Sequence, residues 1–277
     1  MRIRENVAIA LSLAVFICIY GLLCWPMVCA IRLDGWLLRD SEQTIRSRVA
    51  TCAHWWGSIV FFLVVRLLRL DVEIVVDGKR ELVWERACIV IANHQSTLDI
   101  AVIAWLMKQL GQTNVRWIMK QPLRNVPVIG WIAQRIGCAF VSRQKNPADV
   151  EAIERCARIL REDHAAVILF PEGTRFSKAN ATAEFRHVLP PKKTGFTLLR
   201  TSLPDAPIVT VTLQWTPPVA DGSRGKTIFQ AADFYGKSLS IAVRVVTPDE
   251  VRADQHWLEH DWKAKDRLLA SHVSDSA

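Results

Sequence analysis

Residues 88–110 read CIVIANHQSTLDIAVIAWLMKQL, and the rest of the chain is organised around this stretch. The apolar, β-branched run 88–92 is typical of a buried strand, whereas 100–110 has the length and the pattern of an apolar helix. The seven residues from Asn93 to Asp99 therefore lie at a strand-to-helix turn. Turns of this kind carry functional residues in proteins with alternating strands and helices.

The turn holds one histidine and one acid, His94 and Asp99. Residues five apart differ by about 140° around a regular helix, so these two side chains meet only if the backbone bends between them. With Ser96 or Thr97 as helix N-cap, Asp99 occupies the first turn and His94 the preceding loop, from which its imidazole can fold back. This predicts a histidine base oriented by an acid. Ser96 and Asp99 also match a capping box, in which the acid serves only a backbone donor.

The composition sets limits on the fold and on the partners. The chain has 277 residues, of which 51% are hydrophobic, and Lys plus Arg number 35 against 27 Asp plus Glu. This length accommodates one α/β domain with a membrane element. The positive charge suits anionic lipids or phosphorylated substrates. We expect no nucleic-acid partner, because the basic residues are spread out and no nucleic-acid-binding module is recognisable. The seven cysteines include no C-x-x-C pair and indicate a reducing or lipid-buried setting.

Two uncharged stretches precede the main domain. Residues 6–31 span about 26 positions, enough to cross a hydrocarbon core and too many for a signal-peptide core, and residues 49–65 span about 17. Two full spans would carry the arginines of the connecting loop to the far side, against the positive-inside rule. We therefore expect residues 1–70 to form a membrane-embedded helical pair in one leaflet or a shallow re-entrant hairpin, at the cytosolic face (the inner membrane in a bacterium), with two true spans as the alternative. Four tryptophans occupy positions typical of interface anchors: Trp25, Trp36, Trp55 and Trp56.

Residues 71–277 form the second predicted unit, in which strands and helices alternate. This alternation predicts an α/β sheet covered by helices, with its sites in the loops beyond the strand ends. The predicted strands are 72–76, 89–92, 115–119, 139–141, 166–170, 208–213 and 241–246. The predicted helices are 100–110, 128–136, 148–163, 195–202 and 255–270.

A second motif, FPEGTR, occupies residues 170–175 at the end of a predicted strand. Pro171 ends the strand ladder, and Gly173 lets backbone amides approach a ligand closely. Arg175 offers a planar fork that suits a phosphate, and Glu172 could hold that fork or accept a substrate hydroxyl. An ordinary Glu172–Arg175 ion pair across the turn is the alternative.

Two further cations, Lys120 and Arg143, also follow predicted strands. Together with Arg175 they could gather at one sheet edge around a single anion. The competing interpretation is that each is a solvated cation at a strand end, which is usual for such residues.

Taken together, these motifs resemble the glycerolipid acyltransferase family, whose best-known members are the 1-acyl-glycerol-3-phosphate acyltransferases. The N-H-x-x-x-x-D motif is matched by Asn93, His94 and Asp99, the glycine-led strand ending in arginine by 137–143, and F-P-E-G-T-R by 170–175. A fourth motif, a proline followed by β-branched residues, is matched more loosely by 207–209, which lacks the second proline of many members. The resemblance spans about residues 71–246. Residues 187–196, HVLPPKKTGF, are similar to the branch with animal-type lysophosphatidic acid and lysocardiolipin acyltransferases.

The resemblance implies a glycerolipid acyltransferase-type αβ domain with a central mixed sheet. It also implies transfer of a fatty acyl group from acyl-CoA or acyl carrier protein to a lysophospholipid hydroxyl. Lysophosphatidic acid is the first choice of acceptor and lysocardiolipin an alternative. His94 and Asp99 would be catalytic, and the acceptor would be bound by Lys120, Arg143, Glu172, Gly173, Thr174 and Arg175. Neither a metal nor a tightly held cofactor is implied.

Three other functions remain open from the sequence. Ser96 could form an acyl-enzyme with His94 as its base. Residues 256–260 read HWLEH, which matches a zinc-peptidase pattern through His256, Glu259 and His260, although a solvated amphipathic helix explains them as well. A noncatalytic lipid-binding adaptor is the third.

Overall fold

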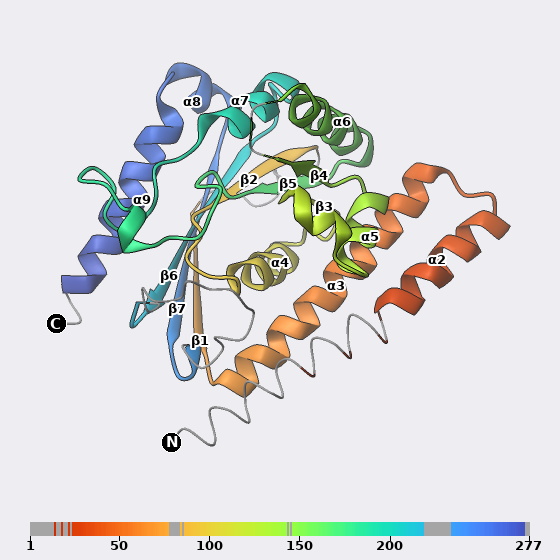
Figure 1. Cartoon of the computed structure of the whole chain (residues 1–277), viewed down its shortest axis with the longest axis horizontal. Helices are drawn as coiled ribbons and strands as arrows, with labels where there is room; N and C mark the ends of the chain where they lie inside the picture. Colours follow the sequence, from red (N-terminus) through yellow and green to blue (C-terminus); the bar gives the residue numbers. More distant parts are fainter. Residues whose placement is uncertain are drawn as a thin grey trace.

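The computed structural model describes residues 14, 18, 22, 24–77, 84, 86–142, 144, 146–218 and 234–274. They form a seven-stranded sheet in the order β1-β7-β6-β2-β5-β3-β4, with helices on both faces (Figure 1). The strands are β1 Asp71–Asp77, β2 Cys88–Ala92, β3 Val115–Lys120, β4 Ala139–Val141, β5 Ala166–Leu169, β6 Ile208–Thr216 and β7 Ser238–Val246. The helices are α2 Trp25–Leu37, α3 Glu42–Leu68, α4 Asp99–Gln109, α5 Ile129–Arg135, α6 Pro147–Asp163, α7 Lys193–Ser202, α8 Pro248–Ala253 and α9 Trp257–Ser274, with short 3-10 helices η2 Gln121–Asn125 and η3 Lys178–Asn180.

The sheet is mixed, as predicted. Strand β2 pairs in parallel with β5 and β6, and β3 pairs in parallel with β5 and β4. The pairing of β6 with β7 is antiparallel. The carboxyl ends of β2, β3, β4, β5 and β6 consequently meet at one edge, where the loops carrying the predicted site residues begin.

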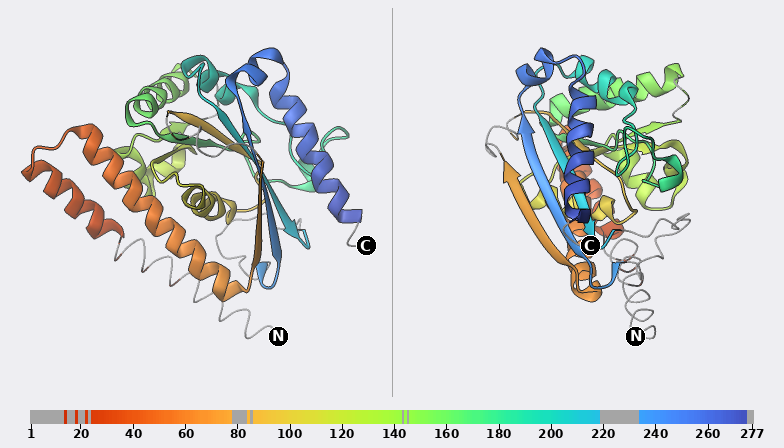
Figure 2. Two further views of the ribbon diagram at one scale, coloured as in Figure 1. Left: turned by 180° about the vertical axis from the view of Figure 1, so that it is seen from behind. Right: turned by 90° about the vertical axis from the view of Figure 1, so that its left-hand side faces the viewer.

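Two apolar layers sandwich the sheet, and β2 shows why. All five residues of β2 are buried, and successive side chains point to opposite faces. Val90 packs with α3 and α4, whereas Ile89 and Ile91 pack with α6, α7 and α9. Figure 2 shows the two helical layers from behind and from the side. A strand covered on both faces reads as a continuous apolar run, which is the pattern from which it was predicted.

The order and type of the predicted strands and main helices are confirmed, and the differences have local causes. Strand β6 continues to Thr216 because β7 pairs with it along its whole length, with Trp215 opposite Leu239. Helix α8 was not predicted. It is six residues long and is closed by a capping box between Thr247 and Glu250.

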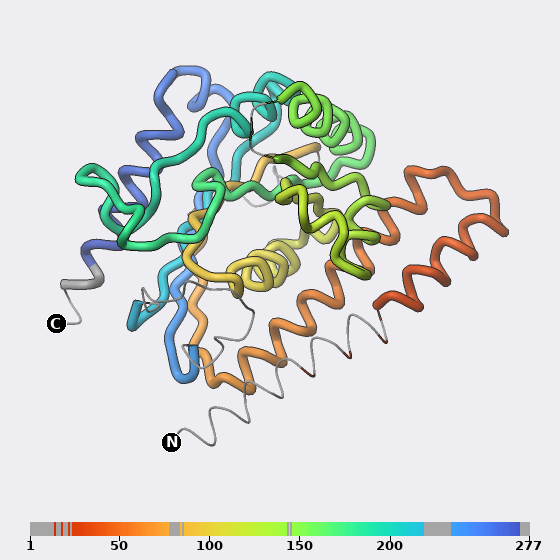
Figure 3. Tube along the Cα trace, in the orientation of Figure 1, coloured from red at the N-terminus to blue at the C-terminus, as the bar shows by residue number. Residues whose placement is uncertain are grey.

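The N-terminal helices α2 and α3 form a hairpin beside the domain (Figure 3). Most of the predicted apolar stretch 6–31 precedes Trp25 and, apart from residues 14, 18, 22 and 24, lies outside the described residues. Among the described helices, α3 is the one long and apolar enough to cross a membrane, yet 44% of its most apolar 18-residue window is buried inside the protein. It packs on α4 through Phe61, which contacts Trp105.

The hairpin exposes several large apolar side chains. Of the four tryptophans predicted as interface anchors, Trp25, Trp36 and Trp55 are exposed, whereas Trp56 is partly buried. Lys108 of α4 lies over the Trp55 ring, with its Nζ 3.9 Å from the ring centroid. Large exposed aromatic side chains beside cations are typical of a surface that meets lipid headgroups.

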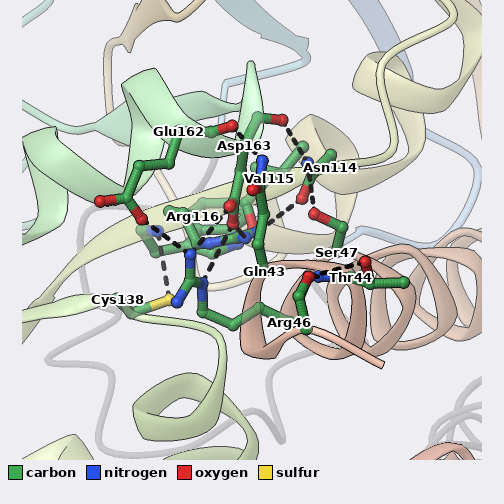
Figure 4. A network of polar contacts seen from close by, with 12 residues as sticks. Gln43, Thr44, Arg46, Ser47, Asn114, Val115, Arg116, Cys138, Glu162 and Asp163 are labelled. Carbon is green, nitrogen blue, oxygen red and sulfur yellow. Dashed lines mark hydrogen bonds and ion pairs between the residues drawn. The ribbon is translucent and has the colours of Figure 1, made fainter. Parts of the chain in front are cut away.

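A buried ionic network holds α3 to the domain (Figure 4). Asp163, the last residue of α6, accepts hydrogen bonds from Arg116 of β3 at 2.5 Å and from Arg46 of α3 at 2.9 and 3.2 Å. Arg46 also pairs with Glu162, whose side chain is largely exposed. The Arg116 and Asp163 side chains are fully buried. The domain therefore neutralises the charge of Arg46, and these contacts fix the N-terminal part of α3.

Candidate active site

Asn93 prolongs the ladder between β2 and β6 by one step. Its side-chain Oδ1 accepts from the backbone N–H of Leu213 at 2.7 Å, and its Nδ2 donates to the carbonyl oxygen of Leu213 at 2.9 Å. The side-chain amide thus takes the place of a backbone hydrogen-bonding partner at the point where the chain leaves the sheet. Asn93 is fully buried, so this pairing holds the start of the turn and places His94 directly after the strand end.

His94 and Asp99 meet as predicted. The imidazole Nδ1 lies 3.1 Å from Asp99 Oδ2, and the Asp99 side chain is fully buried, while 14% of the His94 side chain remains exposed. Asp99 is the first residue of α4, and the N-cap is Leu98 rather than the predicted Ser96 or Thr97. The carboxylate reaches back beyond the helix end and accepts the N–H groups of Gln95 at 2.6 Å and Ser96 at 2.7 Å. These bonds produce the bend that the five-residue spacing required.

Two further donors surround Asp99. Ser96 Oγ donates to Oδ1 at 2.8 Å, and Trp215 Nε1 of β6 donates to the same oxygen at 3.1 Å. An ionised carboxylate only accepts hydrogen bonds, so the Nδ1 of His94 is the donor in their contact. The lone pair of the imidazole is then on Nε2, the arrangement of a general base with an orienting acid. The capping-box interpretation is too narrow, because Asp99 serves the imidazole and Trp215 as well as backbone donors.

The loop after β5 closes over His94. Glu172 Oε1 accepts the backbone N–H of His94 at 2.9 Å, and Phe176 donates its own N–H to the His94 carbonyl at 2.7 Å. The Phe170 ring stacks on the imidazole, with 4.2 Å between the ring centroids and 19° between the planes. The two motifs of the sequence therefore form one unit around this histidine.

Glu172 supports this unit from within. It is 1% exposed, and its second oxygen accepts the N–H of Leu189 at 3.2 Å. Both oxygens thus bind backbone amides, which is a different arrangement from the predicted alternative of a Glu172–Arg175 ion pair. Burial raises the pKa of Glu172 to about 8, and the hydrogen bonds from His94 and Leu189 oppose that rise. A direct contact between Glu172 and an acceptor stays a prediction, whereas its hydrogen bond with the His94 backbone is observed in the structure.

The raised pKa of Glu172 predicts a pH dependence of stability. Between the ordinary pKa of 4.5 and about 8 the folded protein keeps a proton that the unfolded chain has lost, so stability falls as the pH rises through this window. We expect the melting temperature of the wild type to drop more between pH 5 and pH 8 than that of Glu172→Gln, which cannot ionise. Thermal unfolding followed by circular dichroism at both pH values measures this difference. Equal drops would contradict the assignment.

The predicted cations take different positions. Arg175 donates to Thr97 Oγ1 at 2.6 Å, so it lies beside the turn that carries His94. Lys120 is exposed at the end of β3, at the same edge of the sheet as His94. Thr174 is exposed on the loop 170–175. Arg143 lies outside the described residues. Gly173 has φ +71°, a conformation that favours glycine.

Two residues of the site were missed by the sequence interpretation. Trp215 lies beyond the predicted end of its strand, and its alternation with the buried Leu213 was the available signal. Lys192 lies against Gly173 from a segment that was used only to indicate a branch of the family. Neither carries a local motif that points to the site.

The structure gives the zinc-peptidase alternative no support. His256 and His260 are exposed and point their Nδ1 atoms at Glu259 and Asp254, at 3.1 and 2.6 Å. Within the described part of the chain, no group of three or more His, Cys, Asp or Glu side chains is arranged to hold a metal ion. Solvated ion pairs explain the HWLEH sequence.

The acyl-enzyme alternative is also disfavoured. Ser96 is 5% exposed, and its hydroxyl donates to Asp99 rather than to His94. A nucleophilic serine needs its proton directed at the base.

Comparison with known proteins agrees with this site. The model of a protein family described as Acyltransferase matches residues 73–214, which is about half of the chain and contains His94, Asp99 and the loop 170–175. The chain belongs to this acyltransferase family. The resemblance to glycerolipid acyltransferases that the motifs indicated is thereby confirmed.

Two curated relatives are named for different acceptors. The 1-acyl-sn-glycerol-3-phosphate acyltransferase of Saccharomyces cerevisiae is 31% identical over 159 residues, which cover 57% of this chain and 48% of the yeast protein. Lysocardiolipin acyltransferase 1 of Danio rerio is 25% identical over 225 residues, covering 73% of this chain and 56% of that protein. The chain thus spans about half the length of these curated relatives.

A solved structure shares the fold of this chain. The crystal structure of PlsC, the 1-acyl-sn-glycerophosphate (LPA) acyltransferase of Thermotoga maritima, superposes with a TM-score of 0.63 at 21% sequence identity. The match covers 99% of this chain and 97% of that one, so it includes the N-terminal helices as well as the sheet.

Proposed function

We propose that this protein transfers a fatty acyl group from acyl-CoA or acyl carrier protein to the free hydroxyl of a lysophospholipid, with lysophosphatidic acid as the first acceptor. The contact between His94 Nδ1 and Asp99, with the imidazole stacked on the Phe170–Arg175 loop, carries this proposal. Family membership and the names of the relatives support it.

The proposed mechanism uses His94 as general base. Its Nε2 accepts the proton of the acceptor hydroxyl while the oxygen attacks the thioester carbon. A carbon–oxygen bond forms, the carbon–sulfur bond breaks, and the departing thiolate takes the proton back from the imidazolium. Asp99 stabilises the imidazolium and keeps the ring in the required tautomer. The four other donors to Asp99 hold the carboxylate in place during this cycle.

The acceptor phosphate is proposed to lie near Arg175, Lys120 and Arg143. Arg175 is held by Thr97, three residues after His94, so a phosphate bound there keeps the rest of the lipid close to the imidazole. The loop residues Gly173 and Thr174 complete this proposed acceptor site.

The hairpin of α2 and α3 is proposed to rest in the cytosolic leaflet. Its exposed tryptophans and the neighbouring cations suit a headgroup region, where both lysophospholipid and product reside. An interfacial position also agrees with the burial of much of α3 against the domain.

An acceptor panel tests the function. Purified protein in detergent is given oleoyl-CoA with lysophosphatidic acid, lysocardiolipin or monoacylglycerol, and released thiol is measured. We expect the highest kcat/KM with lysophosphatidic acid. Preference for lysocardiolipin would favour the second candidate, which the Danio rerio relative supports. Activity with monoacylglycerol alone would contradict the phosphate site, and no thiol release with any acceptor would contradict acyl transfer.

A further inference from the structure

Lys192 lies against the FPEGTR loop and belongs to neither of the two motifs that form the site. A Cβ atom added to Gly173 would lie 3.2 Å from Lys192 Nζ and 3.3 Å from its Cδ. The aliphatic stem of the lysine therefore runs over the one loop position that has no side chain. This brings its ammonium group to the same loop that carries Arg175.

The backbone of this segment is fixed to the loop at two points. The N–H of Lys192 donates to the Pro171 carbonyl at 2.8 Å, and the N–H of Leu189 donates to Glu172 Oε2 at 3.2 Å. Glu172 in turn binds the backbone of His94. The segment that carries Lys192 is thus joined through Glu172 to the backbone of His94.

The next residue provides a contrast. Lys193 is paired with Glu259 of α9 at 2.8 Å, whereas no carboxylate among the residues that the structure describes pairs with Lys192. Both lysines are exposed at the start of α7. One of two adjacent cations is therefore neutralised by the protein, and the other is presented at the loop beside the site.

We propose that Lys192 binds a phosphate group of a substrate and thereby positions that substrate against His94. This inference rests on the proposed acyl transfer and adds a residue to it. Two sources of phosphate share this chemistry, the headgroup of the acceptor and the phosphates of coenzyme A. A lysine ammonium suits either, because it binds phosphate as a point charge with three donors.

The test compares three variants of the full chain in detergent, Lys192→Ala, Lys192→Arg and Lys193→Ala. KM and kcat are measured separately for lysophosphatidic acid and for oleoyl-CoA. We expect Lys192→Ala to raise the KM for one substrate about tenfold or more, as loss of a charge-assisted bond implies. Lys192→Arg should keep most of the affinity, and Lys193→Ala should leave both KM values within about twofold of the wild type.

Each outcome decides the inference. A rise confined to lysophosphatidic acid identifies the acceptor phosphate, and a rise confined to oleoyl-CoA identifies the donor. If Lys192→Ala and Lys193→Ala behave alike in an active enzyme, the inference is overturned while acyl transfer stands. If the wild type transfers acyl groups to no acceptor, the proposed function is overturned and the inference with it.

Discussion

His94→Ala is expected to lower kcat for acyl transfer by about a thousandfold, within the range of 10²–10⁴ that a positioned general base contributes. The loss should appear in kcat rather than in KM, because the imidazole acts on the hydroxyl proton in the transition state. The fold should survive the change, since Glu172 and Phe176 bind the backbone of residue 94 rather than its ring. Asp99 keeps its bonds to Gln95, Ser96 and Trp215.

The matched control is His256→Ala. This histidine is exposed just before α9 and its side chain pairs with Glu259 of that helix, so its removal should leave acyl transfer unchanged. The measurement is thiol release from oleoyl-CoA with lysophosphatidic acid, together with the melting temperature of both variants. A His94→Ala protein that folds and keeps more than about a tenth of the wild-type kcat would exclude His94 as the base.

Asp163→Ala is expected to cause the largest loss of stability, about 3–5 kcal/mol, because it leaves the fully buried Arg116 without its charge partner. The other acceptors of Arg116 among the described residues, Asn114 Oδ1 at 2.8 Å and the Val115 carbonyl oxygen at 3.2 Å, are neutral, and its Nε lacks a hydrogen-bond partner, so neither acceptor replaces the lost charge. Arg46 loses its two bonds to the same carboxylate, which loosens the attachment of α3. Thermal unfolding in detergent should show a melting temperature lower by roughly 10 °C.

Glu162→Ala is the neighbouring control for this prediction. Its side chain is 58% exposed and pairs with the same Arg46 at 3.0 Å, so the expected loss is at most about 1 kcal/mol. A second variant separates charge from packing. Adding Arg116→Met to Asp163→Ala should recover part of the stability, because an unpaired buried charge costs more than an apolar side chain of similar length. Equal losses of stability for Asp163→Ala and Glu162→Ala would show that the buried Arg116–Asp163 pair contributes no more to stability than the exposed Arg46–Glu162 pair.

The contact between His94 and Asp99 could be predicted from the sequence for a definite reason. A strand followed by a helix places the turn between them at a sheet edge, and both elements were recognisable from local apolar periodicity. The proximity of His94 and Asp99 required only a bend within that turn. The nearness of residues 170–175 followed from parallel strands, whose carboxyl ends meet at one edge.

The partners within the site were not accessible in the same way. Contact with Arg175, three positions along the loop, was one of the alternatives for Glu172, whose oxygens instead bind the His94 and Leu189 backbones. Trp215 donates to Asp99 from β6, which lies beside β2 in the sheet although it comes much later in the sequence. These contacts join residues far apart in sequence, and no local pattern selects one distant partner over another.

The sequence by itself determined the alternation of strands and helices, the place of both motifs at strand ends, and the family, because periodicity and motif spacing are local properties of the chain. Only the tertiary structure decided that Asp99 accepts five hydrogen bonds, that Glu172 accepts the backbone N–H of His94, and that α3 lies partly against the domain. The physical reason is that hydrogen-bond partners and burial depend on which surfaces the folded sheet brings together. A buried carboxylate takes whichever donors surround it in space.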